Sequence, residues 1–301
     1  MRFLSILFAL FISTVFAATI QRREDGKKSH AQPTALPIDW HILSQAAGIS
    51  RHTYCPQQNP GLKVGDAKLL WSSYLGIINQ RVDIFHSPRL GITVAFEGTT
   101  KFPHSIVHDT DFPLVVPDGP LSGVFPPGVS LFEGFMKAYN DVAKETISHA
   151  MKFVKEYNDY RITSTGHSLG AALAAIAGAH FNHALPVDVH VYAFGLPRTG
   201  NQQWADYIDE KLGGRFFYVV NGRDWVPRVP PQGMNYQHPS GEIWIREPST
   251  TDWAYYPGQE NVNGANSVTI KLTFEDHHGV YFHTDLGSTT GACPALVNTE
   301  W

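Results

Sequence analysis

The stretch that decides the fold reads Arg161-Ile162-Thr163-Ser164-Thr165-Gly166-His167-Ser168-Leu169-Gly170 and runs on into an alanine-rich series that ends at Ala179. Its first five residues favour a β-strand, and the alanine-rich series favours a helix. A serine between two glycines at a strand–helix junction is typical of a nucleophile elbow, whose tight turn leaves no room for neighbouring side chains. We therefore predict that Ser168 is a catalytic nucleophile, the alternative being an ordinary serine-containing turn.

Strands and helices alternate around this turn. The spacing of apolar residues predicts helices over Phe132 to Tyr157 and Gln202 to Leu212, and strands over Val187 to Phe194 and Arg215 to Val220. This alternation predicts an α/β fold with a mostly parallel sheet flanked by helices, in which functional groups gather at the carboxyl ends of the strands. The further expected elements are a helix over Pro37 to Ile49, a hairpin over Arg81 to Phe96 and a strand over Val268 to Phe274.

An acid is needed downstream of Ser168. A serine hydroxyl becomes nucleophilic when a histidine takes its proton, and an acid fixes the tautomer of that histidine. In sheet enzymes of this kind the chain order is serine, acid, histidine. Asp224 directly follows an expected strand and is the predicted acid, with a solvated loop aspartate as the alternative. Asp206 and Asp209 fall inside an expected helix, and Asp188 falls at the start of a strand.

Four histidines follow Asp224, namely His238, His277, His278 and His283. His277 and His278 come after the last expected strand, close enough to the C-terminus to return to the sheet edge, so one of them is the predicted base. Spacing does not separate two adjacent residues. His238 lies in a loop rich in proline and glycine and is expected to be a packing or surface residue.

Two donors for an oxyanion are expected near the serine. One is the backbone N–H of Leu169, which follows the nucleophile at a helix start, where the dipole favours negative charge. The other comes from Gly98-Thr99 at the end of a strand, although this pair also fits an ordinary turn. Phe112 and Trp225 are candidates for the wall of a substrate pocket, or else core residues.

An irregular, proline-rich and apolar stretch extends from about Lys101 to Gly128. Long irregular loops of this kind are uncommon without a functional reason. Because the stretch begins directly after the expected oxyanion strand, we interpret residues 100–116 as a lid over the site, the alternative being an ordinary packed insertion.

The N-terminus resembles a secretory signal. Residues 1–17 carry a basic start, an apolar run too short to span a membrane and small residues before a cut after Ala17. The alternative is a buried N-terminal helix. Residues 18–31 are polar and contain Arg22-Arg23, which fits a second processing site or a solvated tail. Residues 32–301 then form one catalytic domain, long enough to bury a large core.

Charge and cysteine content set further limits. The net charge is −4, and removing residues 1–17 takes away Arg2 and no acidic residue, so it becomes −5. With no basic patch, nucleic acid is not an expected partner. Cys55 and Cys293 are the only cysteines. In a secreted chain this pair predicts one disulfide, and two buried thiols are the alternative.

From about Trp71 to Phe282 the chain resembles the secreted fungal class 3 lipases. The resemblance depends on the serine motif, on Gly98-Thr99 and on three further motifs. These motifs are Gly195-Leu196-Pro197-Arg198-Thr199-Gly200-Asn201, Asp224-Trp225-Val226-Pro227-Arg228 and His278-Gly279-Val280-Tyr281-Phe282. The last matches the family's histidine followed by two variable residues and Tyr-Phe, which favours His278 over His277 as the base. Glu97 departs from the arginine usual before the glycine.

The resemblance implies an α/β-hydrolase fold with a lid, no cofactor, no metal and hydrolysis of acylglycerol esters at a lipid–water interface. Trp225 stands where an aliphatic residue is more usual, as in mono- and diacylglycerol lipases, including those of lipophilic skin yeasts. We therefore expect a secreted, monomeric enzyme for partial glycerides without a transmembrane segment. A triacylglycerol lipase, a feruloyl-type esterase and a non-catalytic lipid-binding protein are the alternatives.

Overall fold

The computed structural model describes residues 26–56, 59–75, 80–99, 112–286, 293 and 295–297. Within these residues, nine strands form one mixed sheet in the order β1-β2-β3-β4-β7-β8-β9-β10-β11. The strands from β4 to β10 are mutually parallel, and antiparallel strands extend the sheet at both edges. The prediction of a mostly parallel central sheet is confirmed.

The strands of this sheet are β1 (Lys63–Val64), β2 (Ala67–Leu75), β3 (Gln80–Ser87), β4 (Gly91–Phe96), β7 (Arg161–His167), β8 (Asp188–Phe194), β9 (Phe216–Asn221), β10 (Glu242–Ile245) and β11 (Trp253–Tyr256). Two small antiparallel pairs lie outside it, β5 (Leu114–Val115) with β6 (Leu131–Phe132) and β12 (Val280–Tyr281) with β13 (Thr284–Asp285). The helices are α2 (Trp40–His52), α4 (Glu133–Tyr157), α5 (Leu169–Ala184) and α6 (Gln202–Leu212).

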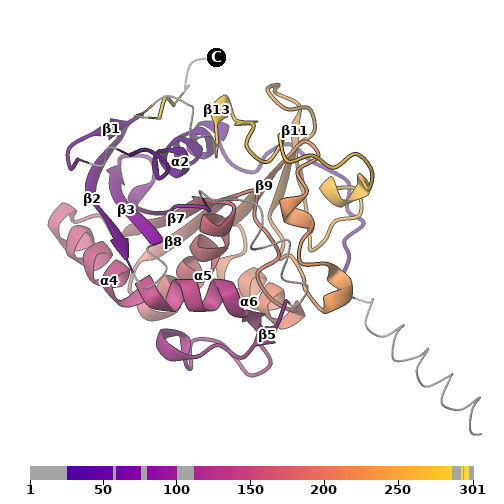
Figure 1. The fold of residues 1–301 in the computed structure, drawn as a ribbon, viewed down its shortest axis with the longest axis horizontal. Helices are drawn as coiled ribbons and strands as arrows, with labels where there is room; N and C mark the ends of the chain where they lie inside the picture. The colour runs from indigo at the N-terminus through magenta and orange to yellow at the C-terminus, as the bar shows by residue number, and fades with distance from the viewer. Residues whose placement is uncertain are drawn as a thin grey trace, which may run out of the picture.

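Helices cover both faces of the sheet. Figure 1 shows α2 on one side of the sheet and α4, α5 and α6 on the other. The core divides in the same way, because the buried residues of α2 pack into one apolar cluster and those of α4 to α6 into another. Helix α5 is apolar all round, which matches its place between the sheet and the neighbouring helices. Strand β7 lies in the middle of the sheet, so Ser168, which directly follows it, lies near the centre of the fold.

The strand predicted over Val268 to Phe274 is wrong. The segment follows a short 3-10 helix, and only Thr273 makes a β-bridge, to Asp224. Ile270 is 71% exposed, so the alternating pattern does not mark a buried face. At that edge of the sheet the outer strand is β11, and its Tyr255 pairs with Thr34 rather than with this segment.

The expected signal peptide and Arg22-Arg23 lie outside the described residues. The described end of the polar segment, residues 26–31, packs against the loop at 257–262. Ser29 donates its N–H to Gln259 at 2.8 Å and accepts from Val262 at 2.9 Å, and Asn261 donates to the Ala31 carbonyl at 3.0 Å. This end of the segment is therefore attached to the domain.

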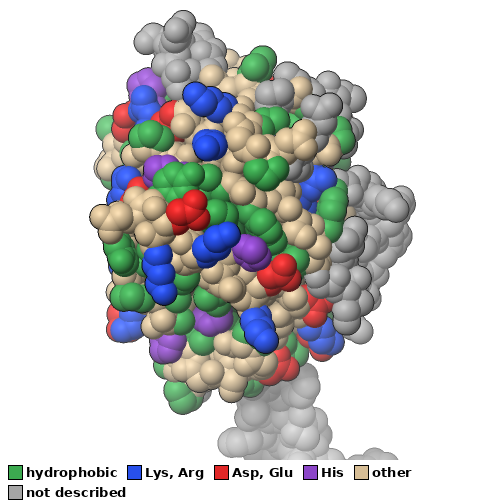
Figure 2. Space-filling view, turned by 90° about the vertical axis from the view of Figure 1, so that its left-hand side faces the viewer, with side chains coloured by type: hydrophobic (Ala, Val, Ile, Leu, Met, Phe, Trp, Pro, Cys, Tyr) green, Lys and Arg blue, Asp and Glu red, His purple; other side chains and the backbone are tan. Residues whose placement is uncertain are grey.

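The molecular surface carries mixed charge. Figure 2 shows the face over β2 and α4, where basic, acidic and histidine side chains are interspersed with hydrophobic ones. None of the described helices is long and apolar enough to cross a membrane.

Candidate active site

Ser168 occupies the sharp turn between β7 and α5. Its backbone has φ 60° and ψ −125°, a strained conformation for a residue with a side chain. The turn is close-packed, because a Cβ on Gly166 would collide with the backbone of Gly170, and a Cβ on Gly170 with that of Phe96. The Ser168 N–H donates to the Phe194 carbonyl at 2.9 Å, which fixes the turn against β8. The strand, turn and helix predicted around Ser168 are all present.

Asp224 and His277 form a buried pair beside this turn. Asp224 follows β9, and its Oδ2 lies 2.8 Å from His277 Nδ1, with both side chains 0% exposed. The Val226 N–H donates to Asp224 Oδ1 at 2.8 Å, and the Tyr281 hydroxyl donates to Oδ2 at 3.4 Å. Gly195 is required next to the pair, because a Cβ there would lie 2.8 Å from the His277 ring.

The structure thus places His277 against Asp224, whereas the sequence predicted His278 as the partner of this acid. The His278 ring is half-buried and lies edge-on to Phe274 at 4.5 Å, whereas His277 turns its ring inward to the carboxylate. Tyr281 anchors the turn, because its single hydroxyl proton lies between the His277 carbonyl, at 3.3 Å, and Asp224 Oδ2, at 3.4 Å. Three residues separate His277 from Tyr281, one more than the family pattern assumes, and the turn accommodates the extra residue.

The electrostatic environment keeps the His277 ring neutral. Burial lowers the pKa of His277 well below its usual value, and the neighbouring His278 lowers it further. The ionised Asp224 carboxylate only accepts, so with this partner Nδ1 donates and Nε2 carries the lone pair. Burial raises the pKa of Asp224, and the donors from Val226 and Tyr281 oppose that rise. The pair thus has a neutral imidazole of one fixed tautomer.

A low pKa at His277 predicts how activity depends on pH. In the triad proposed below, His277 is the general base, which works only when neutral, so kcat/KM falls as pH drops through the pKa of His277. Because burial lowers this pKa below 6.5, we expect the midpoint of the acid limb to lie below pH 6.5. The measurement is kcat/KM for a soluble short-chain ester across the acid range. A midpoint at or above pH 6.5 would contradict this environment for the base.

The two expected oxyanion donors stand at the ends of neighbouring elements. Leu169 is the first residue of α5, and Thr99 lies just past the end of β4, next to β7 in the sheet. Glu97, the departure from the usual arginine, is buried near Arg81, and Gln80 donates to the Glu97 carbonyl at 2.6 Å. Burial raises the pKa of Glu97 to about 7, although Arg81 opposes the rise.

The expected pocket residues lie on two different segments. Trp225 is half-buried beside Asp224, with its ring 6.3 Å from that of Phe274. Phe112, also half-buried, tilts against Phe132 at 5.7 Å, and its carbonyl accepts from the Tyr236 hydroxyl at 3.1 Å. Most of the expected lid, residues 100–111, lies outside the described residues.

A buried ion pair holds the loop that follows Asp224, and sequence reasoning missed it. Arg198 binds both carboxylate oxygens of Glu260, at 2.6 and 3.0 Å, with the two side chains 4% and 1% exposed. The remaining Arg198 nitrogen donates to the carbonyls of Arg228 and Pro230 at 2.6 and 3.0 Å. Only the arginine in the Gly195 to Asn201 motif signals this pair, because the partner lies 62 residues away.

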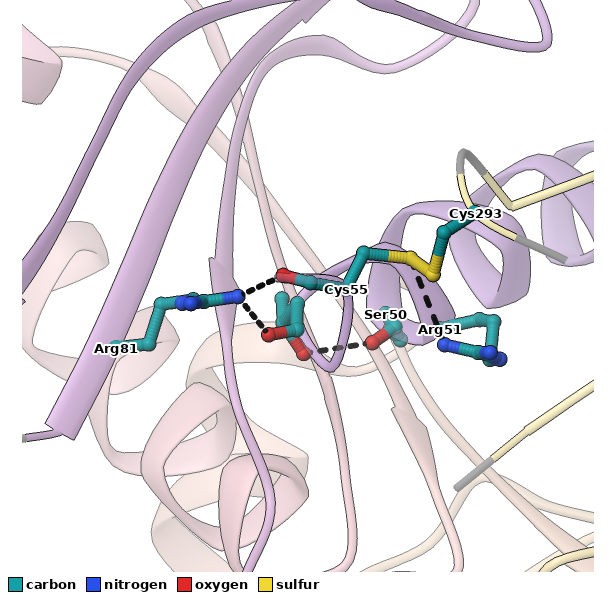
Figure 3. Close-up of a disulfide and its surroundings, with 6 residues drawn as sticks. Ser50, Arg51, Cys55, Arg81 and Cys293 are labelled. Atoms are coloured by element: carbon teal, nitrogen blue, oxygen red, sulfur yellow. Dashed lines mark hydrogen bonds between the residues drawn. A yellow bond between two sulfur atoms is a disulfide. The ribbon is translucent and has the colours of Figure 1, made fainter. Parts of the chain in front are cut away.

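The predicted disulfide between Cys55 and Cys293 is present and joins the end of α2 to the C-terminal tail. Figure 3 shows Arg81 reaching from β3 to the carbonyl of Cys55, and Arg81 also donates to the Thr53 carbonyl at 2.8 Å. His238 is buried and donates to the Pro227 carbonyl at 2.8 Å, so it is the packing residue expected. Among the described side chains, no cluster of three His, Cys, Asp or Glu suits a metal ion.

The chain is similar to known lipases. The profile of the class 3 lipases matches residues 93–234. The secreted mono- and diacylglycerol lipase LIP4 of Malassezia restricta is 53% identical over 99% of this chain and 100% of its own length. The secreted mono- and diacylglycerol lipase LIP1 of Malassezia globosa is 42% identical over 99% of both chains.

Solved structures of fungal lipases have the same fold as this chain. Lipase II from Rhizopus niveus has a TM-score of 0.73 at 25% identity and covers 86% of this chain and 100% of its own. The lipase from Rhizopus microsporus var. chinensis has a TM-score of 0.73 at 29% identity and covers 88% and 95%. The resemblance noted in the sequence therefore extends over nearly the whole chain.

Proposed function

This chain belongs to the class 3 lipase family, and from that premise we propose that it hydrolyses mono- and diacylglycerols, with Ser168 as nucleophile and His277 as base. It is a secreted carboxylic ester hydrolase with the α/β-hydrolase fold. The observation that carries the proposal is the buried His277–Asp224 pair, at 2.8 Å, beside the strained turn of Ser168. A protein that only binds lipid has no need of such a pair.

The reaction follows from the roles of these side chains. His277 Nε2 takes the Ser168 proton while the serine oxygen attacks the ester carbonyl. Asp224 holds the imidazole and stabilises its positive charge. The N–H groups of Leu169 and Thr99 bind the oxyanion, and the alcohol leaves with the proton from His277. Water then attacks the acyl-enzyme by the same route and releases the fatty acid.

Partial glycerides are proposed as substrates for two reasons. The relatives from Malassezia are named mono- and diacylglycerol lipases, and Trp225 lies next to Asp224, where its bulk restricts the space for a third acyl chain. The test is fatty-acid release from emulsified monoolein, diolein and triolein, with Ser168→Ala as the control. We expect release from the first two substrates only and none with Ser168→Ala. Equal release from triolein would make the enzyme a general lipase.

Trp225 is the side chain proposed to exclude triolein. Replacing it with leucine shortens the side chain while keeping the site apolar, so we expect the triolein-to-diolein rate ratio of Trp225→Leu to rise about tenfold, within the range that steric fit supplies. Phe125→Leu is the matched control, because Phe125 is also half-buried but lies outside the proposed lid and packs against Trp204 and Tyr207 of α6. An unchanged ratio for Trp225→Leu would remove Trp225 as the selective element.

We also propose that the mature enzyme is a monomer that works at a lipid–water interface, with residues 100–116 as the lid and residues 1–17 removed on secretion. Exposed apolar residues at the end of the proposed lid and in the segment before His277 support this. Val116, at the end of the proposed lid, is 76% exposed, and Ile270, in the loop that leads to His277, is 71% exposed. Such side chains suit contact with lipid.

A further inference from the structure

The hydroxyl of Tyr54 lies where the three parts of the site meet, although no motif points to this residue. Tyr54 follows α2 and is 8% exposed. Its hydroxyl is 2.8 Å from His167 Nδ1, and the backbone N–H of Gly98 hydrogen-bonds to it. The packing is tight, because a Cβ on Gly98 would collide with the Tyr54 hydroxyl and with the His167 carbonyl.

The hydrogen bonds at this point have one possible direction. His167 Nε2 lies 2.8 Å from the His277 carbonyl, which only accepts, so Nε2 carries the proton. Burial lowers the pKa of His167 well below its usual value, which keeps the ring neutral and makes Nδ1 an acceptor. The Tyr54 hydroxyl therefore donates to His167 and accepts from Gly98. A continuous chain runs from the Gly98 N–H through Tyr54 and His167 to the His277 carbonyl.

We propose that Tyr54 is a positioning residue that fixes the oxyanion strand, the nucleophile turn and the base loop relative to one another. Gly98 precedes the donor Thr99, His167 precedes Ser168, and the His277 carbonyl belongs to the base itself. This inference depends on the proposed function, since it concerns the geometry of the same triad. Tyr54 itself contacts no reacting atom and acts through its two neighbours.

The backbone on either side of Tyr54 is held independently. Figure 3 shows Arg81 in contact with the Cys55 carbonyl, and Arg81 also donates to the Thr53 carbonyl at 2.8 Å. Cys55 is further fixed by its disulfide to Cys293. These restraints limit the movement of Tyr54, so its hydroxyl serves as a fixed reference point. A side chain on a mobile loop would not hold the triad in this way.

The test is Tyr54→Phe, which removes the hydroxyl and leaves the ring. With a soluble short-chain ester we expect kcat to fall about tenfold to hundredfold while KM stays within about twofold, because alignment is lost and binding is not. The matched control is Tyr139→Phe. Tyr139 on α4 is also buried, and its hydroxyl makes the same kind of contact, 2.9 Å from His180 Nδ1 on α5. We expect a similar loss of thermal stability in both variants but an unchanged kcat in the control.

A second pair of variants tests the next residue in this series of hydrogen bonds, His167. His167→Gln keeps an amide donor for the His277 carbonyl, whereas His167→Leu keeps none, so we expect the glutamine variant to retain about tenfold more kcat at equal stability. The inference is overturned if Tyr54→Phe loses no more kcat than Tyr139→Phe. If Tyr54→Phe does not fold, equal kcat for the two His167 variants overturns it instead. A wild-type enzyme without esterase activity would instead count against the proposed function.

Discussion

Replacing His277 with alanine is expected to lower kcat about 10³-fold to 10⁴-fold, whereas His278→Ala should retain kcat within about tenfold. The reason is geometric. His277 Nδ1 is 2.8 Å from the Asp224 carboxylate, and its ring is fully buried, while the His278 ring lies against Phe274. The measurement is kcat for a soluble ester, with the thermal midpoint of each variant recorded to show that both remain folded.

The two adjacent variants control for each other. Each removes one imidazole from the same turn, so a general loosening of the turn would affect both alike. A large loss in His278→Ala with a small loss in His277→Ala would reverse the assignment and restore the family pattern that favours His278.

Removing the disulfide is expected to lower the free energy of unfolding by about 5 kcal/mol. Cys55 and Cys293 are 238 positions apart, so the bond closes nearly the whole domain and strongly restricts the unfolded chain. The variant is Cys55→Ser combined with Cys293→Ser, compared with wild type by denaturant unfolding. A larger denaturant slope should accompany the loss, because the unfolded chain expands further.

Reductant supplies the control for this prediction. Adding it to wild type should reproduce the loss seen in the double variant, and adding it to the double variant should change nothing, since the chain has only these two cysteines. Coincident unfolding curves for wild type and the double variant would show that the bond contributes no stability.

Elements whose signals are local could be predicted from the sequence. Helix α6 has the predicted bounds, Gln202–Leu212, because its start is marked by Asn201, whose side chain caps the Trp204 N–H at 3.0 Å. Ser168 and Asp224 likewise follow strands that runs of β-branched or aromatic residues indicate in the sequence. The segment at 268–274 alternates apolar and polar residues, but among the described residues it makes only one bridge to another segment, and pattern alone does not reveal that.

Long-range contacts could not be predicted in this way. Tyr54 meets His167 across 113 positions, and no property of the sequence near either residue indicates the pairing. The choice between His277 and His278 depends on how a turn is anchored by Tyr281, whose hydroxyl lies within reach of both Asp224 and the His277 carbonyl. One residue more or less in that turn decides which ring faces the acid, so counting back from the Tyr-Phe pair indicates His278, whereas Asp224 contacts His277 in the structure.

The most direct test of the catalytic centre is covalent labelling by an alkyl fluorophosphonate, followed by mass spectrometry of the modified peptide. The reagent reacts only with a serine that is activated by a base and faces an oxyanion site. We predict one label per chain, on Ser168, with ester hydrolysis lost in proportion to labelling, and a rate about 100-fold lower or more in His277→Ala than in His278→Ala. Labelling at another residue, or hydrolysis that persists after Ser168 is fully modified, would contradict the proposed triad.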